Sequence, residues 1–136
     1  MEVEVLCEQV RAFLIERLNP EFVVLFGSFS RGLAHEKSDV DLAFYAPHLK
    51  ISPLEVFQIA GELADVIGRS VDLINIEEAS TVFKAQIFGY GLPIFIRDEE
   101  AFDRYRMSAL SMYTVLNEDR KPILSKIYES GTIYGD

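Results

Sequence analysis

Residues 22–45 read FVVLFGSFSRGLAHEKSDVDLAFY, and this stretch decides the fold. Its first five residues, 22–26, are continuously apolar, which is typical of a strand buried on both faces. Gly27 and Ser28 end that strand, and Ser28 is suited to cap a short helix after it. A second apolar run covers residues 40–45. We therefore expect a strand, a short helix and a second strand in succession.

Three aspartates lie in or beside the apolar runs, although acids are disfavoured in strands. Asp39 and Asp41 are two residues apart, and side chains on a strand alternate between its faces, so both point the same way. Asp72 lies in a third apolar run, residues 71–76, and is expected to join them from a neighbouring strand. We therefore predict a nest of carboxylate oxygens on one face of the sheet.

Helices and strands alternate along the rest of the chain. Apolar residues at three- and four-residue spacing predict the helices, and Ser52 followed by Pro53 is a typical helix start. The predicted helices cover residues 3–18, 53–67, 79–90, 98–119 and a short segment at 123–128, and a fourth strand covers 92–96. The stripes predicted to be buried include Val56, Ile59, Ala60, Leu63, Val66 and Ile67, and later Phe102, Tyr105, Ala109, Met112, Tyr113 and Leu116. This alternation predicts an α/β fold in a single domain of residues 1–136, with C-terminal helices from about residue 98.

Composition narrows the class of protein. The chain has 136 residues, 49% of them hydrophobic and 26% charged, which suits one globular domain. Its formal net charge of −9 argues against direct binding to nucleic acid, which needs a basic surface. Cys7 is the only cysteine and is expected in the core. No apolar run is long enough to cross a bilayer and the N-terminus is acidic, so we expect a cytoplasmic protein without a membrane partner.

Clustered carboxylates are typical of sites that handle phosphates with divalent cations. Mg²⁺ prefers oxygen ligands, and two such ions can hold the attacking and leaving oxygens of a phosphate transfer. Asp39 and Asp41 are suited to bridge two ions, and Asp72 to bind the ion near the attacking hydroxyl and to help accept its proton. Taken alone, Asp39 and Asp41 would usually be a solvated strand face and Asp72 an exposed strand residue. The three acids together, inside apolar runs, favour a site.

Gly27, Ser28, Arg31 and Lys37 are the candidates for binding a nucleotide. Gly27 lets the backbone approach a phosphate, and Ser28 adds a hydroxyl and, at a helix start, exposed N–H groups. Arg31 lies one turn further on, and Lys37 precedes the acids, whose charge it could offset. For Arg31 and Lys37, an ordinary surface position is about as good an explanation as phosphate contact.

Together, these residues resemble a known signature. Gly27, Ser28, ten intervening residues and the triplet that begins at Asp39 are similar to the GSx10DxD motif of the nucleotidyltransferase superfamily related to DNA polymerase β. GSFSRG also resembles the GSxxRG form of minimal nucleotidyltransferases, and Asp72 in VDLI is similar to the third carboxylate of the family. The small, acidic chain resembles the MntA-type antitoxins that pair with HEPN ribonuclease toxins. The resemblance covers about residues 1–96.

The resemblance implies a nucleotidyltransferase fold, a small mixed sheet flanked by helices. It implies Mg²⁺-dependent transfer of AMP from ATP to a tyrosine of a HEPN ribonuclease toxin, which is thereby inactivated. It also implies that Gly27 and Ser28 hold phosphate, while Asp39, Asp41 and Asp72 bind metal and carry the catalysis.

Two other functions stay open at this point. The first is a small-molecule nucleotidyltransferase of the aminoglycoside type, although such enzymes usually carry an added substrate-binding domain and about 40 C-terminal residues are few for one. The second is a non-catalytic antitoxin that covers its toxin through C-terminal aromatic side chains. The candidates for that interface are Tyr105, Tyr113, Tyr128 and Tyr134.

Overall fold

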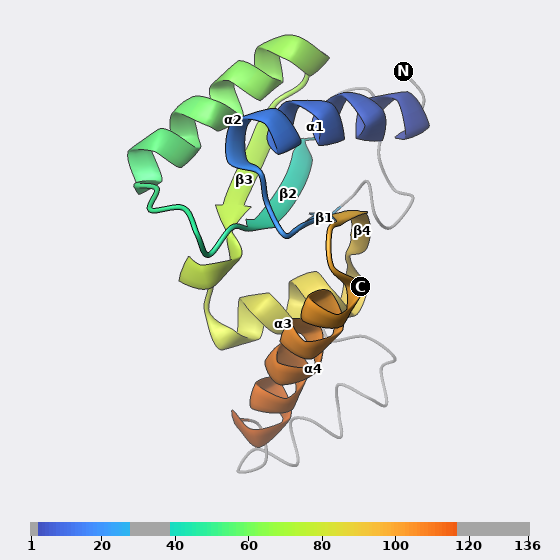
Figure 1. Ribbon diagram of the computed structural model, residues 1–136, viewed down its shortest axis with the longest axis vertical. Coiled ribbons are helices and arrows are strands. Elements are labelled where there is room, and N and C mark those ends of the chain that lie inside the picture. The colour runs from blue at the N-terminus through green and yellow to red at the C-terminus, as the bar shows by residue number, and fades with distance from the viewer. Residues whose placement is uncertain (1–2, 28–38, 117–136) are drawn as a thin grey trace.

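The computed structural model describes residues 3–27 and 39–116, which alternate between helices and strands (Figure 1). In order the elements are α1 (Val3–Leu18), β1 (Phe22–Phe26), β2 (Val40–Tyr45), α2 (Pro53–Ile67), β3 (Val71–Asn75), the 3-10 turn η1 (Ile76–Glu78), α3 (Thr81–Tyr90), β4 (Leu92–Ile96) and α4 (Glu99–Leu116). The predicted α/β fold is confirmed. Across this described part of the chain, no helix is long and apolar enough to cross a membrane.

The four strands form one mixed sheet in the order β3-β2-β1-β4. β1 pairs antiparallel with both β2 and β4, whereas β2 and β3 run parallel. Parallel neighbours need a crossover connection, which α2 supplies between β2 and β3. β1 and β2 are therefore the central strands, and this explains why their sequences are almost continuously apolar.

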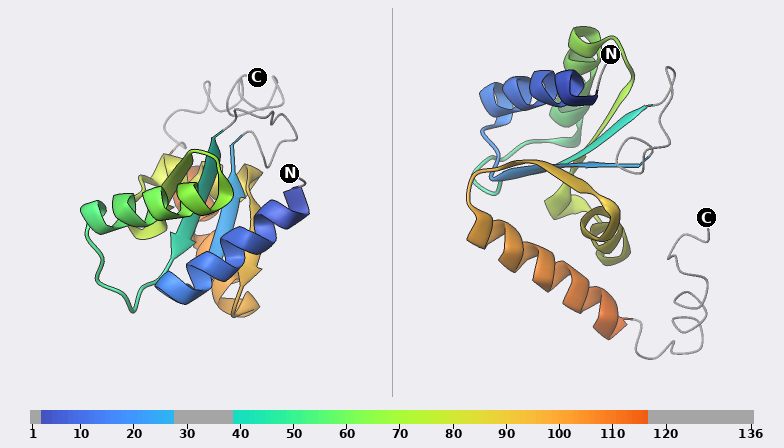
Figure 2. Two further views of the ribbon diagram at one scale, coloured as in Figure 1. Left: turned by 90° about the horizontal axis from the view of Figure 1, so that it is seen from above. Right: turned by 90° about the vertical axis from the view of Figure 1, so that its right-hand side faces the viewer.

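Helices cover both faces of the sheet, giving three layers (Figure 2). One core forms where α1 and α2 pack on Val23 and Leu25, and Cys7 is buried there as predicted. The other core forms where α3 and α4 meet Phe22 and Val24. Alternation along β1 thus sends successive side chains into two separate cores.

Aromatic packing attaches α4 to the sheet. The Phe22 ring contacts the rings of Tyr45, Phe88, Phe102 and Tyr105 at centroid distances from 5.0 to 5.9 Å. Tyr105 also lies 4.5 Å from Tyr45. Such pairs contribute about 0.5–1.5 kcal/mol each beyond the area they bury. The aromatic residues of α4 therefore extend the core that begins under α3.

Short-range signals set the ends of α2. The Ser52 hydroxyl accepts a hydrogen bond from the backbone N–H of Glu55 at 3.1 Å, and the Glu55 carboxylate accepts one from the Ser52 N–H at 3.3 Å. This reciprocal capping box satisfies two of the N–H groups that a helix start leaves unpaired. Gly68 ends the helix with a φ of 71°, a left-handed conformation that favours glycine.

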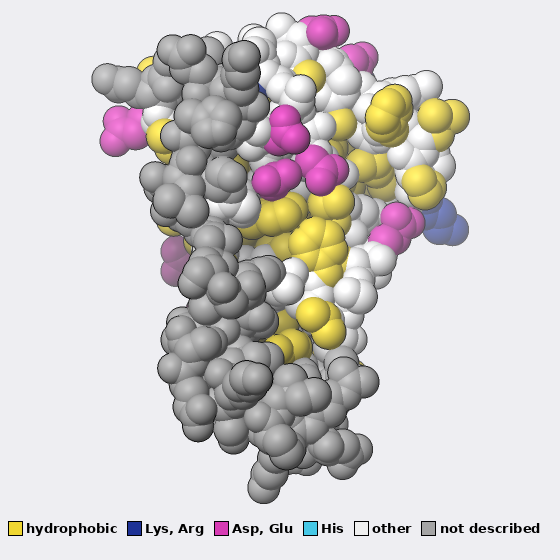
Figure 3. Space-filling view, turned by 180° about the vertical axis from the view of Figure 1, so that it is seen from behind, with side chains coloured by type: hydrophobic (Ala, Val, Ile, Leu, Met, Phe, Trp, Pro, Cys, Tyr) yellow, Lys and Arg dark blue, Asp and Glu magenta, His cyan; other side chains and the backbone are white. Residues whose placement is uncertain are grey.

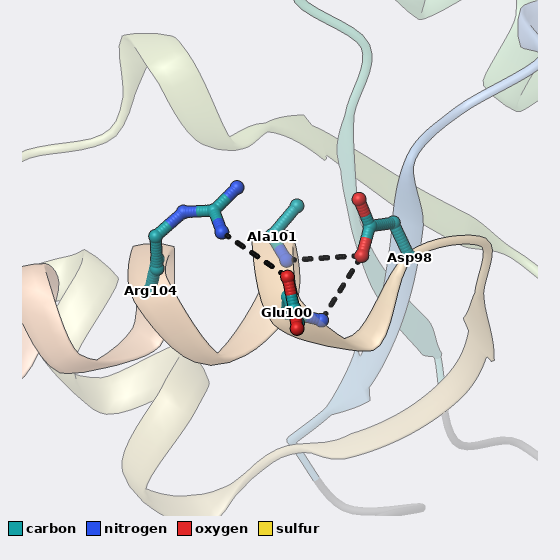
Figure 4. A network of polar contacts seen from close by, with 4 residues as sticks. All are labelled: Asp98, Glu100, Ala101 and Arg104. Atoms are coloured by element: carbon teal, nitrogen blue, oxygen red, sulfur yellow. Dashed lines mark hydrogen bonds and ion pairs between the residues drawn. The ribbon is translucent and has the colours of Figure 1, made fainter.

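The start of α4 is fixed by Asp98 (Figure 4). Its carboxylate accepts hydrogen bonds from the backbone N–H groups of Glu100 at 3.0 Å and Ala101 at 3.3 Å. Arg104, one turn further on, lies 3.9 Å from the Glu100 carboxylate, an exposed ion pair that adds little stability. The carboxylate of Asp98 favours a helix start because it offsets the positive end of the helix dipole.

Two side chains predicted to be buried are exposed instead. Val66 is 52% exposed and Met112 is 56% exposed. Both neighbour a buried residue, Ile67 and Tyr113, and a helix turns by about 100° per residue, so each points away from the core. Tyr113 is buried and Tyr105 packs in the aromatic core, so neither is the free interface side chain that a purely binding antitoxin was expected to present.

The ends of other elements also differ from the prediction. β3 stops at Asn75, one residue early, because the Asn75 side chain accepts a hydrogen bond from the Glu77 N–H at 3.2 Å and starts η1. α3 begins at Thr81 rather than Ala79, because Ser80 caps it. The short helix predicted after Ser28 and the helix predicted at 123–128 lie outside the described residues.

Gly91 ends α3 as predicted, but its backbone is extended, with a φ of −78°. A Cβ at this position would lie 2.3 Å from the Ile87 carbonyl oxygen and 2.4 Å from Cγ1 of Val24. Glycine is therefore needed for the close approach of α3 and β4 to β1, rather than for a left-handed turn.

Candidate active site

The three aspartates come together at one end of the neighbouring strands β2 and β3. Asp39 directly precedes β2, Asp41 is the second residue of β2, and Asp72 is the second residue of β3. In the parallel register of β2 and β3, the Cα atoms of Asp41 and Asp72 are partners. The structure thus brings together the acids that the alternation pattern singled out, while their roles stay a prediction.

The acids lie on the face of the sheet that α3 and α4 cover. Asp41 shares its side of β2 with Ala43, and Asp72 shares its side of β3 with Ile74, and both apolar residues belong to the core under these helices. Asp39 and Asp72 are exposed and Asp41 is half-buried, so this end of the face is open. Figure 3 shows acidic side chains gathered in the middle of one face of the molecule, next to a hydrophobic area.

Gly27 lies against the carboxylate of Asp41. β1 and β2 pair so that Phe26 is opposite Asp41, and Gly27 follows with a φ of 71°. A Cβ at this position would lie 2.2 Å from Oδ2 of Asp41. In this backbone conformation, only glycine leaves room for the carboxylate. The turn at Gly27 and the carboxylate of Asp41 therefore lie side by side.

The electrostatics of the site centre on Asp41. Burial, followed by the negative charges of Asp72 and then of Asp39, raises the pKa of its carboxyl from 3.8 to about 6. The three carboxylates are thus close enough to repel one another. Acids that repel one another at a strand end add no stability and indicate a candidate site for a cation or another positive group.

The donors gathered here fit a hard cation. Carboxylate oxygens are the ligands that Mg²⁺ prefers, and a cation would offset the repulsion at Asp41. Within residues 3–27 and 39–116, no three His, Cys, Asp or Glu side chains are already drawn around one point as metal ligands. Mutual repulsion among the three carboxylates favours such an open arrangement. The metal site therefore stays a prediction that the donor chemistry supports.

Three of the predicted nucleotide-binding residues, Ser28, Arg31 and Lys37, lie outside the described residues. Gly27, the fourth, is the last described residue before them. It adjoins Asp41, so the segment predicted to hold phosphate begins beside the acids.

A groove that the sequence did not predict opens beside Asp72 along the edge strand β3. This edge groove has a volume of about 500 Å³ and is lined by α2 on one side and by η1 and the start of α3 on the other. Its lining includes Pro53, Val56, Phe57, Asp72, Ile74 and Phe83. The one signal in the sequence is Phe57, a large aromatic residue outside the apolar stripe of α2, and its side chain is 75% exposed.

The raised pKa of Asp41 predicts how stability depends on pH. The folded protein binds a proton here more tightly than the unfolded chain, so this group stabilises the fold below pH 4 and its contribution is lost as pH rises to about 6. Because solvent reaches the half-buried carboxylate, we expect the loss to be about 1–2 kcal/mol. Urea unfolding of the wild type and of Asp41→Asn, in the presence of a chelator and between pH 4 and 7, measures this loss. The unfolding free energy of the variant should vary with pH by about 1–2 kcal/mol less than that of the wild type. Parallel profiles would contradict the assignment.

Comparison with known proteins identifies the class. The Polymerase beta, Nucleotidyltransferase family matches residues 8–100, and the chain belongs to this family. The chain is also similar to the protein adenylyltransferase MntA of Shewanella oneidensis, with 30% identity over 109 residues, which are 79% of this chain and 76% of that relative.

Solved structures agree with the fold. A chain from the crystal structure of a toxin-antitoxin with AMP-PNP matches with a TM-score of 0.79 and 25% identity, covering 90% of this chain and 98% of the other. A chain from the structure of a tri-AMPylated Shewanella oneidensis HEPN toxin in complex with an MNT antitoxin matches with a TM-score of 0.74 and 22% identity, covering 92% and 98%. The predicted nucleotidyltransferase fold, a small mixed sheet flanked by helices, is confirmed.

Proposed function

We propose that the protein is the antitoxin of a HEPN toxin pair and silences its partner by adenylylation. The observation that carries the proposal is the pairing of Asp41 with Asp72 beside Gly27, in a chain 30% identical to a protein adenylyltransferase. The likeness to a toxin-antitoxin structure with AMP-PNP supports both an adenine nucleotide as substrate and a protein partner. The cytoplasmic location predicted from the sequence belongs to the same proposal.

The reaction transfers AMP to a tyrosine of the toxin. The phenol oxygen attacks the α-phosphorus of ATP, the new O–P bond forms, and the bond to the oxygen that bridges the α- and β-phosphates breaks, so that pyrophosphate leaves with the electron pair. We assign Asp72 to accept the phenolic proton. We assign Gly27, Ser28, Arg31 and Lys37 to hold the phosphates.

Asp39, Asp41 and Asp72 are assigned to bind Mg²⁺, as two ions. When bound, these ions would neutralise charge on the phosphates and hold the attacking and leaving oxygens in line. The protein contributes the fixed spacing of its carboxylates on two hydrogen-bonded strands, since sites built on strands hold their geometry better than sites on loops.

The exposure of the site favours an acceptor that arrives on another protein. Asp39 and Asp72 are exposed, and the edge groove leads away from Asp72 along the surface. An open site of this kind can admit a side chain that projects from a partner. Small-molecule sites are usually concave and enclose most of their ligand.

Labelled ATP tests the proposal directly. The protein is incubated with Mg²⁺, the unmodified product of the neighbouring gene and ATP labelled at the α- or the γ-phosphate. We expect label from the α-phosphate on a tyrosine of the partner, none from the γ-phosphate, and no transfer in the presence of a chelator.

Other outcomes point to other functions. Label on an aminoglycoside but not on the partner would show a small-molecule enzyme. Label from the γ-phosphate would show a kinase. Full neutralisation of the partner without any label transfer would show an antitoxin that acts by binding alone.

A further inference from the structure

The strand order gives the active site two distinct sides. Gly27 follows β1, Asp41 lies on β2 and Asp72 lies on β3, in neighbouring positions across the sheet. The segment assigned to the phosphates begins at Gly27, on the β1 side. Asp72 is therefore the acid farthest across the sheet from Gly27, at the edge strand. A group that approaches from the β3 edge reaches Asp72 first.

Asp72 is one of the residues that line the edge groove. The groove follows β3, bounded by α2 on one side of the strand and by η1 and the start of α3 on the other. Phe57 and Pro53 line it from α2, and Phe83, which is half-buried against Phe26, lines it from α3. Its volume of about 500 Å³ is enough for an aromatic ring and the residues beside it.

The charges of the edge groove favour a neutral or cationic group over a phosphate that has no bound cation. Among the described residues that line it, the charged ones are Asp72 and Glu78, both acidic. A phosphate without a bound cation would be repelled by both acids. A neutral phenol is not repelled, and a partner with cationic residues beside its tyrosine would gain from the acids. Apolar and aromatic side chains supply the contact surface that a tyrosine ring needs.

The exposure of Phe57 is consistent with an aromatic binding surface. Its side chain is 75% exposed, and it lies in a groove continuous with the active site. Large apolar side chains that are exposed in a groove rimmed by polar residues typically mark a site for a ligand or a partner. Val66, on the same helix, is also exposed but is not among the residues that line the groove.

We propose that the edge groove is the acceptor site: it holds the tyrosine ring of the partner against Phe57 and Phe83, with the phenol oxygen beside Asp72. This proposal rests on the proposed function and specifies it further. Bond formation is as written above: the phenol oxygen binds the α-phosphorus, pyrophosphate leaves, and the phenolic proton is released. The groove positions the acceptor and takes no part in binding the phosphates.

The test is Phe57→Ala, compared with Val66→Ala as a matched truncation on the same helix and with Phe57→Tyr as the variant that keeps the ring. Each is mixed with unmodified partner, Mg²⁺ and increasing ATP, and the single-turnover rate of AMP transfer is measured. We expect Phe57→Ala to lower the rate at saturating ATP about tenfold without changing the ATP concentration that gives half the maximal rate. Val66→Ala should keep the wild-type rate, Phe57→Tyr should retain more of the rate than Phe57→Ala because it keeps the ring, and thermal unfolding should show that all three fold.

Every other outcome overturns the proposal. If Phe57→Ala raises the half-saturating ATP concentration and regains the full rate at high ATP, the groove holds the adenine base instead. If neither quantity changes while the wild type transfers AMP, the acceptor binds elsewhere and the proposed function stands without this site. If the wild type transfers no AMP, both the proposed function and the acceptor site are wrong.

Discussion

Replacing Asp39 and Asp41 together by asparagine should abolish AMP transfer while leaving the fold at least as stable as in the wild type. Asparagine keeps the size of the side chain but removes two negative charges from the site. Since electrostatic stabilisation of the transferring phosphate is the main task of such a site, we expect the rate to fall at least about a thousandfold. Stability should not fall, because Asp41 is half-buried among like charges that raise its pKa to about 6.

Two measurements on the same samples check this expectation. The rate of label transfer to the partner reports on function, and urea unfolding in a chelator at pH 7 reports on the fold. Asp65→Asn is the matched control, because it removes an exposed aspartate from α2, away from the site. The control should keep the wild-type rate. A double variant that transfers AMP normally, or one that loses activity only because it unfolds, would contradict a catalytic role for these acids.

Gly27→Ala should reduce both activity and stability. The backbone at Gly27 is left-handed, with a φ of 71°, which costs a residue with a Cβ about 1–2 kcal/mol. The new Cβ would also lie 2.2 Å from Oδ2 of Asp41, so the carboxylate must move away. A displaced catalytic group loses its geometry, and we expect the transfer rate to fall about a hundredfold.

Gly68→Ala provides the control that separates these two effects. Gly68 has the same φ of 71°, but a Cβ there would meet nothing within 4 Å. Both variants should lose about 1–2 kcal/mol of unfolding free energy, measured in urea. Only Gly27→Ala should also lose activity, measured by label transfer under conditions in which both variants are folded. Equal activity in the two would show that the contact between Gly27 and Asp41 has no part in the reaction.

The main features of the fold and the position of the acids could be predicted from the sequence because they depend on short periods. The alternation of side chains along residues 40–45 predicted that Asp39 and Asp41 lie on one face of the strand and Val40, Leu42 and Phe44 on the other. The three apolar residues do lie in the core under α1 and α2. Asp72 was expected on a neighbouring strand, and it does lie beside Asp41, on the strand that pairs parallel with β2.

Features that depend on tertiary contacts could not be predicted in this way. The edges of the buried stripes were wrong at Val66 and Met112, because the spacing of apolar residues shows that a helix has a buried side but not how far around the helix the packing reaches. The role of Gly91 depends on the distance to Val24, a residue far away in the sequence. The edge groove depends on the strand order, which leaves β3 at an edge with Phe57 beside it.

The most direct test of the account is the intact mass of the partner after co-expression with this protein. The wild type should leave the partner heavier by one or more AMP units, and fragmentation should place them on tyrosine. The Asp39→Asn, Asp41→Asn double variant should leave the partner at its unmodified mass. An unmodified partner with the wild type, or the same added mass with the double variant, would contradict the claim that the three aspartates form an adenylyl-transfer site.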